Sequence, residues 1–285
     1  MLVSDLDMLE DALILGIRNF MKETGFTRVH LGLSGGIDSA LVAYLAVKAA
    51  GAENVTGFSM PSRFSSQGSK DDAAELAANL GCRCEILPIE ECYNAFLDTL
   101  REVFENRPFD LAEENLQARI RGTLLMAYSN KFNSMLFTTG NKSEISMGYC
   151  TLYGDTNGSL APIGDLFKTD VFALCRRINE RSVSVSGRAV IPQSTIDKAP
   201  SAELRPNQKD EDSLPPYEIL DKILKSYLDE KLSREEIIKQ GFDKDLVDRI
   251  INTNARTEFK RRQLPPVLRI NPLEKTLSAQ AAYQV

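Results

Sequence analysis

The sequence predicts an α/β fold, a Rossmann-like doubly wound parallel sheet with a helical C-terminal extension. Four short apolar runs have the length of buried strands, and segments with helical periodicity separate them. Strands that alternate with helices form βαβ units, whose parallel sheet is covered by helices on both faces. A glycine-rich turn joins the first of these strands to the helix that follows it.

The N-terminal segment predicts an amphipathic helix, because Leu6, Leu9, Leu13, Ile17 and Phe20 recur at helical spacing. The predicted strands follow at 28–33, 54–60, 83–89 and 134–140. The intervening helices are expected at 37–50, at 69–80 and, after the third strand, at two places of which the second is 110–132.

The predicted helix at 110–132 has two distinct faces. Leucines and isoleucine form an apolar stripe on one face, whereas Asn115, Arg119 and Gly122 share another. A polar face of this kind is either solvated or part of a binding site.

The chain changes character after a helix that is expected to begin near Leu166 and to end near Ile178. Residues 182–213 are polar, contain three prolines and lack periodicity, so they form either a disordered loop or a functional lid. Helices are expected again at roughly 216–230, 233–240 and 243–260. We therefore expect one domain, 1–285, with a core sheet at about 25–180, a mobile lid at about 182–213 and C-terminal helices at about 214–262.

Composition limits the functional classes. The chain has 285 residues and a formal net charge of −6, which argues against nonspecific nucleic-acid binding. No apolar run approaches the ~20 residues that span a bilayer, and the N-terminus lacks the pattern of a signal sequence. Five irregularly spaced cysteines, which are Cys82, Cys84, Cys92, Cys150 and Cys175, are typical of reduced thiols, and Cys82 and Cys84 are expected to be buried structural thiols rather than a zinc or redox pair. We expect a cytoplasmic protein without nucleic-acid or membrane partners.

The turn after the first strand is the main functional motif. Ser34, Gly35 and Gly36 aim several backbone N–H groups at one point, and the helix N-terminus adds partial positive charge. Larger side chains than glycine would block the close approach of an anion. Asp38 would repel a phosphate unless Mg²⁺ bridged the two, so the motif predicts a magnesium-dependent phosphate site to which Ser39 adds a hydroxyl.

Two common phosphate motifs do not describe this turn. No lysine follows Gly36, as a P-loop requires, and Gly32, Gly35 and Gly36 lack the spacing of a dinucleotide fingerprint. A helix N-terminus capped by Ser34 or Asp38 would explain the serine and glycines alone. The whole hexapeptide S-G-G-x-D-S after a strand instead resembles the pyrophosphate loop of the ATP pyrophosphatases. These PP-loop proteins have an adenine nucleotide alpha hydrolase-like fold and split ATP between its α- and β-phosphates.

A second motif follows the fourth predicted strand. The segment TTGNKSE, at 138–144, lies at the carboxyl edge of the sheet, where ligands of open parallel sheets bind. Thr139 and Glu144 are therefore expected near Asp38, and Glu144 can complete a hard-cation site with that carboxylate. Taken alone, Thr139 is equally well explained as a helix cap and Glu144 as a solvated carboxylate.

Six ordered segments make a more specific resemblance. They are LGLSGGIDSALVA, MPSRFSSQGSKDDAAELAANLG, EENLQARIRG, TTGNKSEISMGYCTLYGD, KAPSAELRPNQKDEDSLPPYE and EFKRRQLPP. Together they resemble NAD⁺ synthetase over roughly residues 10–270, and above all the synthetase half of the glutamine-dependent form. The nitrilase-like glutaminase domain of that form has no counterpart in this sequence.

Two positions differ from the ammonia-only bacterial type. Leu152 stands where that type has a substrate-binding lysine, and Phe259 stands where it has a histidine. The YCTLYGD version belongs to the glutamine-dependent group. The chain is accordingly either a free-standing enzyme with the sequence of that group or the synthetase part of a longer protein.

The resemblance implies a two-step ligase reaction that uses Mg²⁺. The nicotinate carboxylate of deamido-NAD⁺ attacks the α-phosphate of ATP, which gives an NAD-adenylate and pyrophosphate, and ammonia then displaces AMP to form NAD⁺. The substrate carboxylate is itself the nucleophile, so positioning and charge neutralisation are expected to carry the rate. The resemblance also implies a homodimer, and it leaves open a glutaminase domain or subunit as the source of ammonia.

The resemblance further assigns roles to individual residues. Asp38, Glu144 and Lys168 are expected to be catalytic, with Asp38 and Glu144 as metal ligands. The ATP site is expected to comprise Gly32, Leu33, Ser34, Gly35, Gly36, Ile37, Asp38, Ser39, Arg63, Thr139, Lys168 and Ser201. The deamido-NAD⁺ site is expected to comprise Asn115, Arg119, Glu144, Tyr149, Cys150, Thr151, Leu152 and Lys260.

Simpler explanations exist for several of these residues. Arg63 is equally well explained as an exposed arginine, and Lys260 as part of a basic helix end. Lys168 could be a surface lysine, although a cation in the first turn of a helix is unfavourable unless a phosphate lies nearby. The single histidine, His30, lies within the first strand and is expected to be a packed core residue rather than a base.

Two rival functions share part of the motif set. Other ATP pyrophosphatases, such as the amination halves of GMP and asparagine synthetases or tRNA-modifying enzymes, do not share the GYCTLYGD and KRRQLPP segments. A sensor that binds ATP without turnover would not need the paired carboxylates of Asp38 and Glu144.

Overall fold

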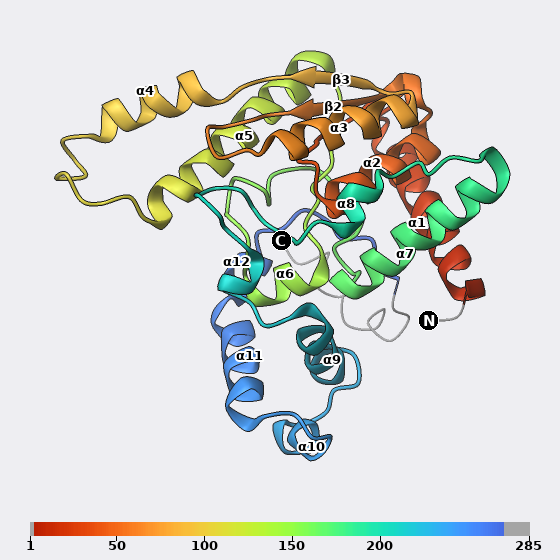
Figure 1. Ribbon diagram of the computed structural model, residues 1–285, viewed down its shortest axis with the longest axis vertical. Helices are drawn as coiled ribbons and strands as arrows, with labels where there is room; N and C mark the ends of the chain where they lie inside the picture. Colours follow the sequence, from red (N-terminus) through yellow and green to blue (C-terminus); the bar gives the residue numbers. More distant parts are fainter. Residues whose placement is uncertain (1–2, 271–285) are drawn as a thin grey trace.

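The computed structural model describes residues 3–270 and contains the predicted α/β core (Figure 1). Four parallel strands form one sheet in the order β3-β2-β1-β4, and they are β1 (Val29–Gly32), β2 (Val55–Ser59), β3 (Arg83–Ile86) and β4 (Met135–Leu136). Val29 of β1 pairs with Val55 on one side and with Met135 on the other. The end of β1 therefore lies in the middle of the carboxyl edge, where open parallel sheets bind their ligands.

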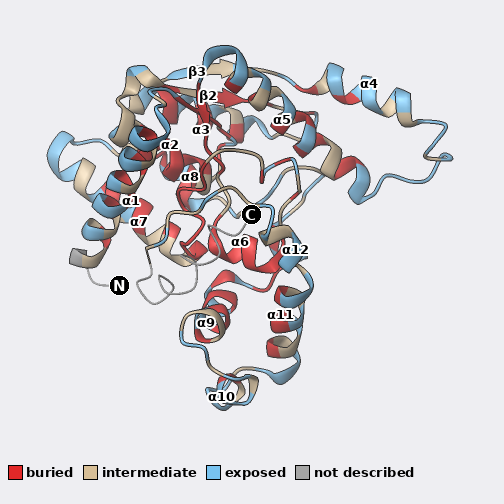
Figure 2. Cartoon of the chain, turned by 180° about the vertical axis from the view of Figure 1, so that it is seen from behind, coloured by how far each residue is buried: buried red, intermediate tan, exposed pale blue. Residues whose placement is uncertain are grey.

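Helices cover both faces of this sheet, so the doubly wound arrangement is confirmed. One face carries α1 (Val3–Thr24), α2 (Ile37–Ala50), α3 (Gln67–Leu80) and α7 (Lys168–Ser186). The other carries α5 (Leu111–Phe132), against which α4 (Glu90–Leu100) packs. Figure 2 shows buried residues gathered between the layers, whereas α4 and the turn after it extend outward and are largely exposed.

The third strand differs from its prediction as a buried strand. β3 is the edge strand and pairs only with β2, so one side of it meets solvent. Ile86, at the end of β3, is accordingly 72% exposed. An apolar run of this length does not by itself distinguish an edge strand from a central one.

His30 is a packed core residue, as expected. Its Nδ1 lies 2.9 Å from Ser134 Oγ, and its Nε2 lies 2.9 Å from the carbonyl oxygen of Leu125. Burial lowers the pKa of His30 to about 4, so the ring is neutral at physiological pH. The histidine ties β1 to α5 and β4 and takes no part in the cavity described below.

The C-terminal helices form the extension that the sequence predicts. They are α9 (Tyr217–Leu228), α10 (Arg234–Lys239), α11 (Lys244–Arg256) and α12 (Glu258–Arg261). The first three pack around their own apolar cluster, to which Leu220 and Ile250 belong. The cluster also takes in Met147 of α6 (Lys142–Met147) and Phe167, so the extension is joined to the core through these residues.

The segment predicted as a long irregular lid is only partly irregular. α7 continues through 182–186 and ends at Gly187, whose positive φ of 73° forms the C-cap, so the helix does not end near Ile178. A short helix follows, α8 (Gln193–Asp197), in which Thr195 and Ile196 are buried. Apolar periodicity fails here because the last turns of α7 are exposed on most sides, and packing on the core decides the rest. The irregular part is divided by α8 into 187–192 and a longer stretch, 198–209.

Two expectations from composition can be compared with the structure. All five cysteines are free, and Cys82 and Cys84, which were expected to be buried, are only half-buried. None of the helices within residues 3–270 is both long enough and apolar enough to cross a bilayer.

Candidate active site at the carboxyl edge of the sheet

A cavity of about 310 Å³ lies where β1, β2 and β4 end. Its walls come from the turn after β1, the first turn of α3, the middle of α5, the loop after β4, α6 and the segment 198–204. This position and size are typical of small-molecule sites in open parallel sheets.

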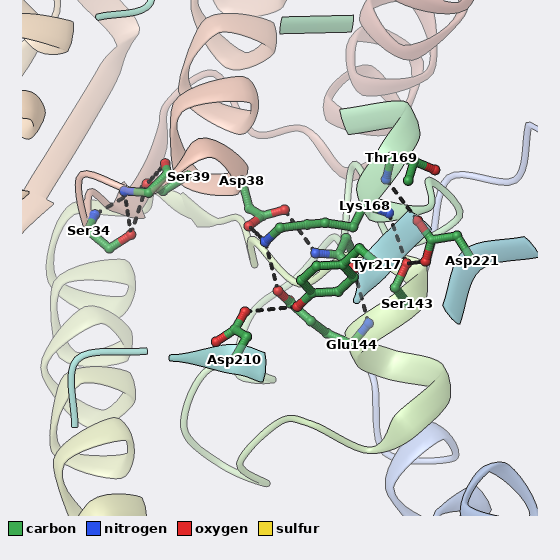
Figure 3. A network of polar contacts seen from close by, with 12 residues as sticks. Ser34, Asp38, Ser39, Ser143, Glu144, Lys168, Thr169, Asp210, Tyr217 and Asp221 are labelled. Carbon is green, nitrogen blue, oxygen red and sulfur yellow. Dashed lines mark hydrogen bonds and ion pairs between the residues drawn. The ribbon is translucent and has the colours of Figure 1, made fainter. Parts of the chain in front are cut away.

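The glycine turn forms one wall. Gly35 has a φ of +75°, and a Cβ atom there would lie 2.7 Å from the Cα of Ser69, so the turn requires glycine. Ser34 Oγ accepts from the backbone N–H of Gly36 at 3.2 Å and lies 3.1 Å from Ser39 Oγ (Figure 3). The N-cap of α2 is Gly36, and no side chain caps the helix, so capping by Ser34 or Asp38 is not the role of these residues. The first N–H groups of α2 thus remain available to an anion.

Lys168 joins the two acids that the sequence singles out. Its Nζ lies 2.5 Å from Asp38 Oδ2 and 3.0 Å from Glu144 Oε1 (Figure 3). The Lys168 side chain is only 3% exposed, and its Nζ lies 5.2 Å from the centre of the Tyr217 ring. The explanations of Lys168 as a surface lysine and of Glu144 as a solvated carboxylate are therefore wrong.

The charges in this cluster do not balance. Burial alone would lower the pKa of Lys168, but Asp38 and Glu144 outweigh it and raise the pKa above its ordinary value. Burial raises the pKa of Glu144, and Lys168 opposes that rise. A third buried acid, Asp210, accepts a hydrogen bond from the Tyr217 hydroxyl at 2.8 Å, and burial raises its pKa as well. One ammonium thus faces three acids, and burial disfavours the charged form of Glu144 and Asp210 unless a further cation lies nearby.

Asn141 holds both acids in position. It is the N-cap of α6, where its Oδ1 accepts from the backbone N–H of Glu144 at 3.0 Å. Its Nδ2 donates to Asp38 Oδ1 at 2.9 Å, across the gap between the ends of β1 and β4. Asn141 rather than Thr139 therefore caps this helix, and Thr139 is left to line the cavity.

Asp221 of α9 fixes the start of α7, which carries Lys168. Its Oδ1 accepts from Ser143 Oγ at 2.5 Å, and its Oδ2 accepts from the backbone N–H of Thr169 at 2.8 Å (Figure 3). Ser143 Oγ also accepts from the backbone N–H of Lys168 at 2.9 Å. Through this buried carboxylate, α9 helps to fix the position of Lys168.

The polar face of α5 contacts the segment that follows α6. Thr151 Oγ1 donates to Asn115 Oδ1 at 2.6 Å, and Arg119 Nε donates to the carbonyl oxygen of Leu152 at 3.2 Å. Gly122 allows this approach, because a Cβ atom there would lie 2.9 Å from the carbonyl oxygen of Gly154. The shared face predicted for this helix therefore supports one side of the cavity margin.

Lys260 supports the same segment from the C-terminal end. Its Nζ donates to the carbonyl oxygens of Gly148 and Cys150, at 2.8 and 2.7 Å. Tyr149 and Cys150 line the cavity between these contacts. The fold thus gathers the residues expected to hold deamido-NAD⁺ at one margin of the cavity, although they come from three parts of the chain.

The structure divides the expected site residues into two groups. The cavity is lined by Gly32, Leu33, Ser34, Gly36, Ile37, Asp38, Ser39, Thr139, Glu144, Tyr149, Cys150, Lys168 and Ser201. The expected residues outside its lining are Gly35, Arg63, Asn115, Arg119, Thr151, Leu152 and Lys260.

Arg63 is the expected ATP residue that the structure turns away from the cavity. Its guanidinium pairs with Glu90 at the start of α4 and donates to Asn94 Oδ1 at 2.7 Å. Both partners lie on the outward-pointing α4, and the Arg63 side chain is 49% exposed. The sequence predicted only that Arg63 follows β2 at the carboxyl edge of the sheet. It did not indicate that Glu90 would pair with Arg63 and hold it away from the cavity.

Several residues of the site escaped the sequence interpretation. Arg121 lines the cavity, its Nε donates to the carbonyl oxygen of Met60 at 3.0 Å, and burial lowers its pKa to about 10. Asn141 gave a usable signal, since asparagine directly before a helix is a common N-cap. Glu203 and Asp210 gave none, because they lie in a polar segment without periodicity.

Comparison with known proteins agrees with this geometry. The family model for NAD synthase matches residues 9–265. A glutamine-dependent NAD(+) synthetase of Synechocystis sp. is 50% identical over 266 residues, which are 93% of this chain and 47% of that protein. The chain spans about half the length of the curated relatives it matches.

Two solved structures share the fold at substantial identity. A glutamine-dependent NAD+ synthetase from Acinetobacter baumannii, in complex with adenosine diphosphate, is 45% identical with a TM-score of 0.65, over 90% of this chain and 45% of that one. An NMN synthetase from Francisella tularensis is 30% identical with a TM-score of 0.74, over 90% of this chain and 95% of that one. Because the family model covers most of the sequence, the chain belongs to the NAD synthase family.

Proposed function

We propose that the chain is an NAD⁺ synthetase, a ligase that amidates deamido-NAD⁺ to NAD⁺ with ATP. The reaction passes through an NAD-adenylate, releases pyrophosphate and AMP, and uses ammonia as the nitrogen donor. One observation carries the proposal: an uncapped helix N-terminus, two acids and a buried lysine converge in a single cavity. Adenylation of a carboxylate needs these groups, because charge must be neutralised on both reactants.

The ATP site would lie along the glycine turn. Backbone N–H groups of the turn and of α2 would hold the β- and γ-phosphates, with hydroxyls from Ser34 and Ser39. Once the phosphates draw Lys168 away from Asp38 and Glu144, its ammonium would neutralise charge on them. Thr139 and Ser201 line the same cavity. The adenosine diphosphate in the Acinetobacter relative supports a nucleotide as ligand.

Asp38 and Glu144 fit Mg²⁺ only together with a nucleotide. Mg²⁺ in proteins is bound through one or two carboxylates together with substrate phosphates, which matches this pair. Within residues 3–270 no group of three or more His, Cys, Asp or Glu side chains is arranged to hold an ion. Because Lys168 Nζ lies between the two acids, the phosphates must draw it away before the acids can act as ligands. When bound, Mg²⁺ would offset charge on the phosphates.

Deamido-NAD⁺ would lie along the margin formed by α5, the segment 149–152 and Lys260. Its nicotinate end would point toward Glu144, so that the carboxylate meets the α-phosphate in the cavity. The residues at this margin already hold one another through hydrogen bonds, which preorganises the site.

We further propose a homodimer. Tyr153 and Phe259 flank the margin and are 65% and 55% exposed, and a second copy of the chain would cover these aromatic side chains. We also keep a glutaminase domain or subunit as an external source of ammonia. The Francisella relative, of which the match covers 95%, supports an amidation unit of this length acting by itself.

One assay tests the function. The purified chain is incubated with ATP, MgCl₂, deamido-NAD⁺ and either ammonium or glutamine, and NAD⁺ and pyrophosphate are measured. We expect both products with ammonium. NAD⁺ formation with glutamine alone would overturn the assignment of the donor, and amidation of nicotinate mononucleotide in place of the dinucleotide would overturn deamido-NAD⁺ as the substrate. Tight ATP binding without turnover would indicate a sensor.

A further inference from the structure

The segment 198–204 forms the roof of the cavity, and all of its residues line it. Lys198 ties one end to α3, where its Nζ lies 2.5 Å from Asp72 Oδ2 and donates to Ser69 Oγ at 3.0 Å. Gln117 of α5 ties the other end, because its Nε2 donates to the carbonyl oxygen of Leu204 at 2.9 Å. The roof therefore spans from the helices of one face of the sheet to those of the other.

Glu203 makes three hydrogen bonds between the roof and the body. Its Oε1 accepts from Ser66 Oγ and from Ser69 Oγ, both at 2.8 Å, and its Oε2 accepts from the backbone N–H of Ser66 at 3.3 Å. These donors belong to the N-cap and first turn of α3, where the helix dipole favours a negative charge. We call Glu203 with Ser66 and Ser69 the clasp.

The backbone conformation of Glu203 is an unfavourable one, which the contacts of its side chain must stabilise. Its φ is +49°, a left-handed conformation that residues other than glycine adopt only when their surroundings require it. The side chain supplies that requirement, since a carboxylate with three donors is held more firmly than a neutral acceptor. The unfavourable backbone is thus coupled to the closed position of the roof.

The clasp also touches the phosphate-binding turn. Ser69, which donates to Glu203, packs so closely on Gly35 that only glycine fits there. Lys198 Nζ approaches the carbonyl oxygen of Gly35 at 3.4 Å. Opening of the roof would therefore expose the turn and the cavity to water at the same time.

We propose that Glu203 is a positioning residue that keeps the roof closed over the acyl-adenylate and so protects it from water. This inference rests on the proposed function. Water that attacks the acyl–phosphate bond would regenerate the nicotinate carboxylate and release AMP and two protons, so ATP would be consumed without forming NAD⁺. A closed roof lets ammonia compete with water in a restricted volume.

The first test measures opening directly and does not depend on turnover. Hydrogen–deuterium exchange of peptides from 198–209 is compared between the unmodified chain and Glu203→Ala. We expect exchange about tenfold faster in the variant, because charge-assisted hydrogen bonds are lost. Glu211→Ala is the matched control, since Glu211 is exposed in the neighbouring turn and its side chain takes no part in the hydrogen bonds of the clasp. Unchanged exchange in Glu203→Ala would overturn the clasp even if the enzymatic proposal failed.

The second test measures leakage. The ratio of AMP released to NAD⁺ formed is followed at limiting ammonium, with the Glu211→Ala variant as reference. We expect the ratio to rise about threefold to tenfold in Glu203→Ala and in Ser69→Ala, and the double variant to add little to either. A variant that slows NAD⁺ formation while the ratio stays near one would show a merely structural role and would refute the protective one.

Discussion

The floor and the roof of the cavity are built in different ways. The floor, residues 32–39, is one continuous strand–turn–helix unit, and the hydrogen bonds among Ser34, Gly36 and Ser39 in its turn run between near neighbours in the sequence. The roof, residues 198–204, is fastened through Glu203 to Ser66 and Ser69 at the start of α3, and these contacts join residues that are more than a hundred positions apart. A floor of this kind is rigid without a ligand, whereas a roof held by a few polar contacts opens at lower free energy. Changes in the floor should therefore remove activity, and changes in the roof should alter the ratio of AMP released to NAD⁺ formed.

The largest expected effect is that of Asp38→Asn in the floor. The change removes a carboxylate paired with Lys168 and proposed to hold magnesium, so NAD⁺ formation should fall by about a thousandfold or more. Circular dichroism should show an intact fold, because Asp38 lies at the cavity surface. Asp11→Asn, at an exposed position of α1, is the control. Near-normal turnover by Asp38→Asn would contradict the assigned site.

A smaller loss is expected for Gly35→Ala. The new Cβ would collide with Ser69, and the turn would shift away from phosphate-binding geometry, so the KM for ATP should rise about a hundredfold. Gly187→Ala is a closely matched control, since its φ of +73° is similar but nothing lies within 4 Å of the added atom. Both variants should lose about 1 kcal/mol of stability, and only the first should lose nucleotide affinity. Equal ATP affinity in both would disprove the tight contact.

The strand beneath the turn should show a characteristic pH dependence of stability. His30 has a folded pKa of about 4, below its unfolded value, so the unfolded state binds more protons between about pH 6.5 and 4. Stability from this group is therefore lost as the pH falls, by about 2 kcal/mol between pH 7.5 and 5. Urea unfolding of the unmodified chain and of His30→Leu at both pH values checks this. The same loss in both chains would show that His30 is not responsible.

The smallest effect is expected for Arg63→Ala, in the loop after β2. Its guanidinium is held by Glu90 and Asn94 outside the cavity, so the KM for ATP should change less than about twofold. Isothermal titration with ATP gives the comparison, and Arg83→Ala, another exposed arginine paired with a nearby glutamate, is the control. A tenfold loss of affinity in Arg63→Ala alone would mean that Arg63 turns inward when the nucleotide binds.

The agreement between sequence and structure follows the same division. The parallel sheet, the glycine turn and the positions of Thr139 and Glu144 at one edge follow from local pattern and from the geometry of parallel sheets, whereas the strand order comes from the structure. The end of α7 and the existence of α8 could not be predicted from the sequence, because exposed or short helices show little apolar periodicity. The polar face of α5 was recognised, but its contact with Thr151 and Leu152 depends on the fold.

By itself, the sequence determined the α/β class, the glycine turn after the first strand and the family. Each of these depends on residues that are close together in the chain, so their pattern can be recognised without knowing the fold. Only the tertiary structure decided that Lys168 lies between Asp38 and Glu144, that Arg63 is drawn outward and that Glu203 fastens the roof. These three outcomes depend on which charge lies nearest in space. The strength of an electrostatic interaction depends on the distance between the charges and on their burial. Both quantities are set by the folded structure and cannot be read from the spacing of residues along the chain.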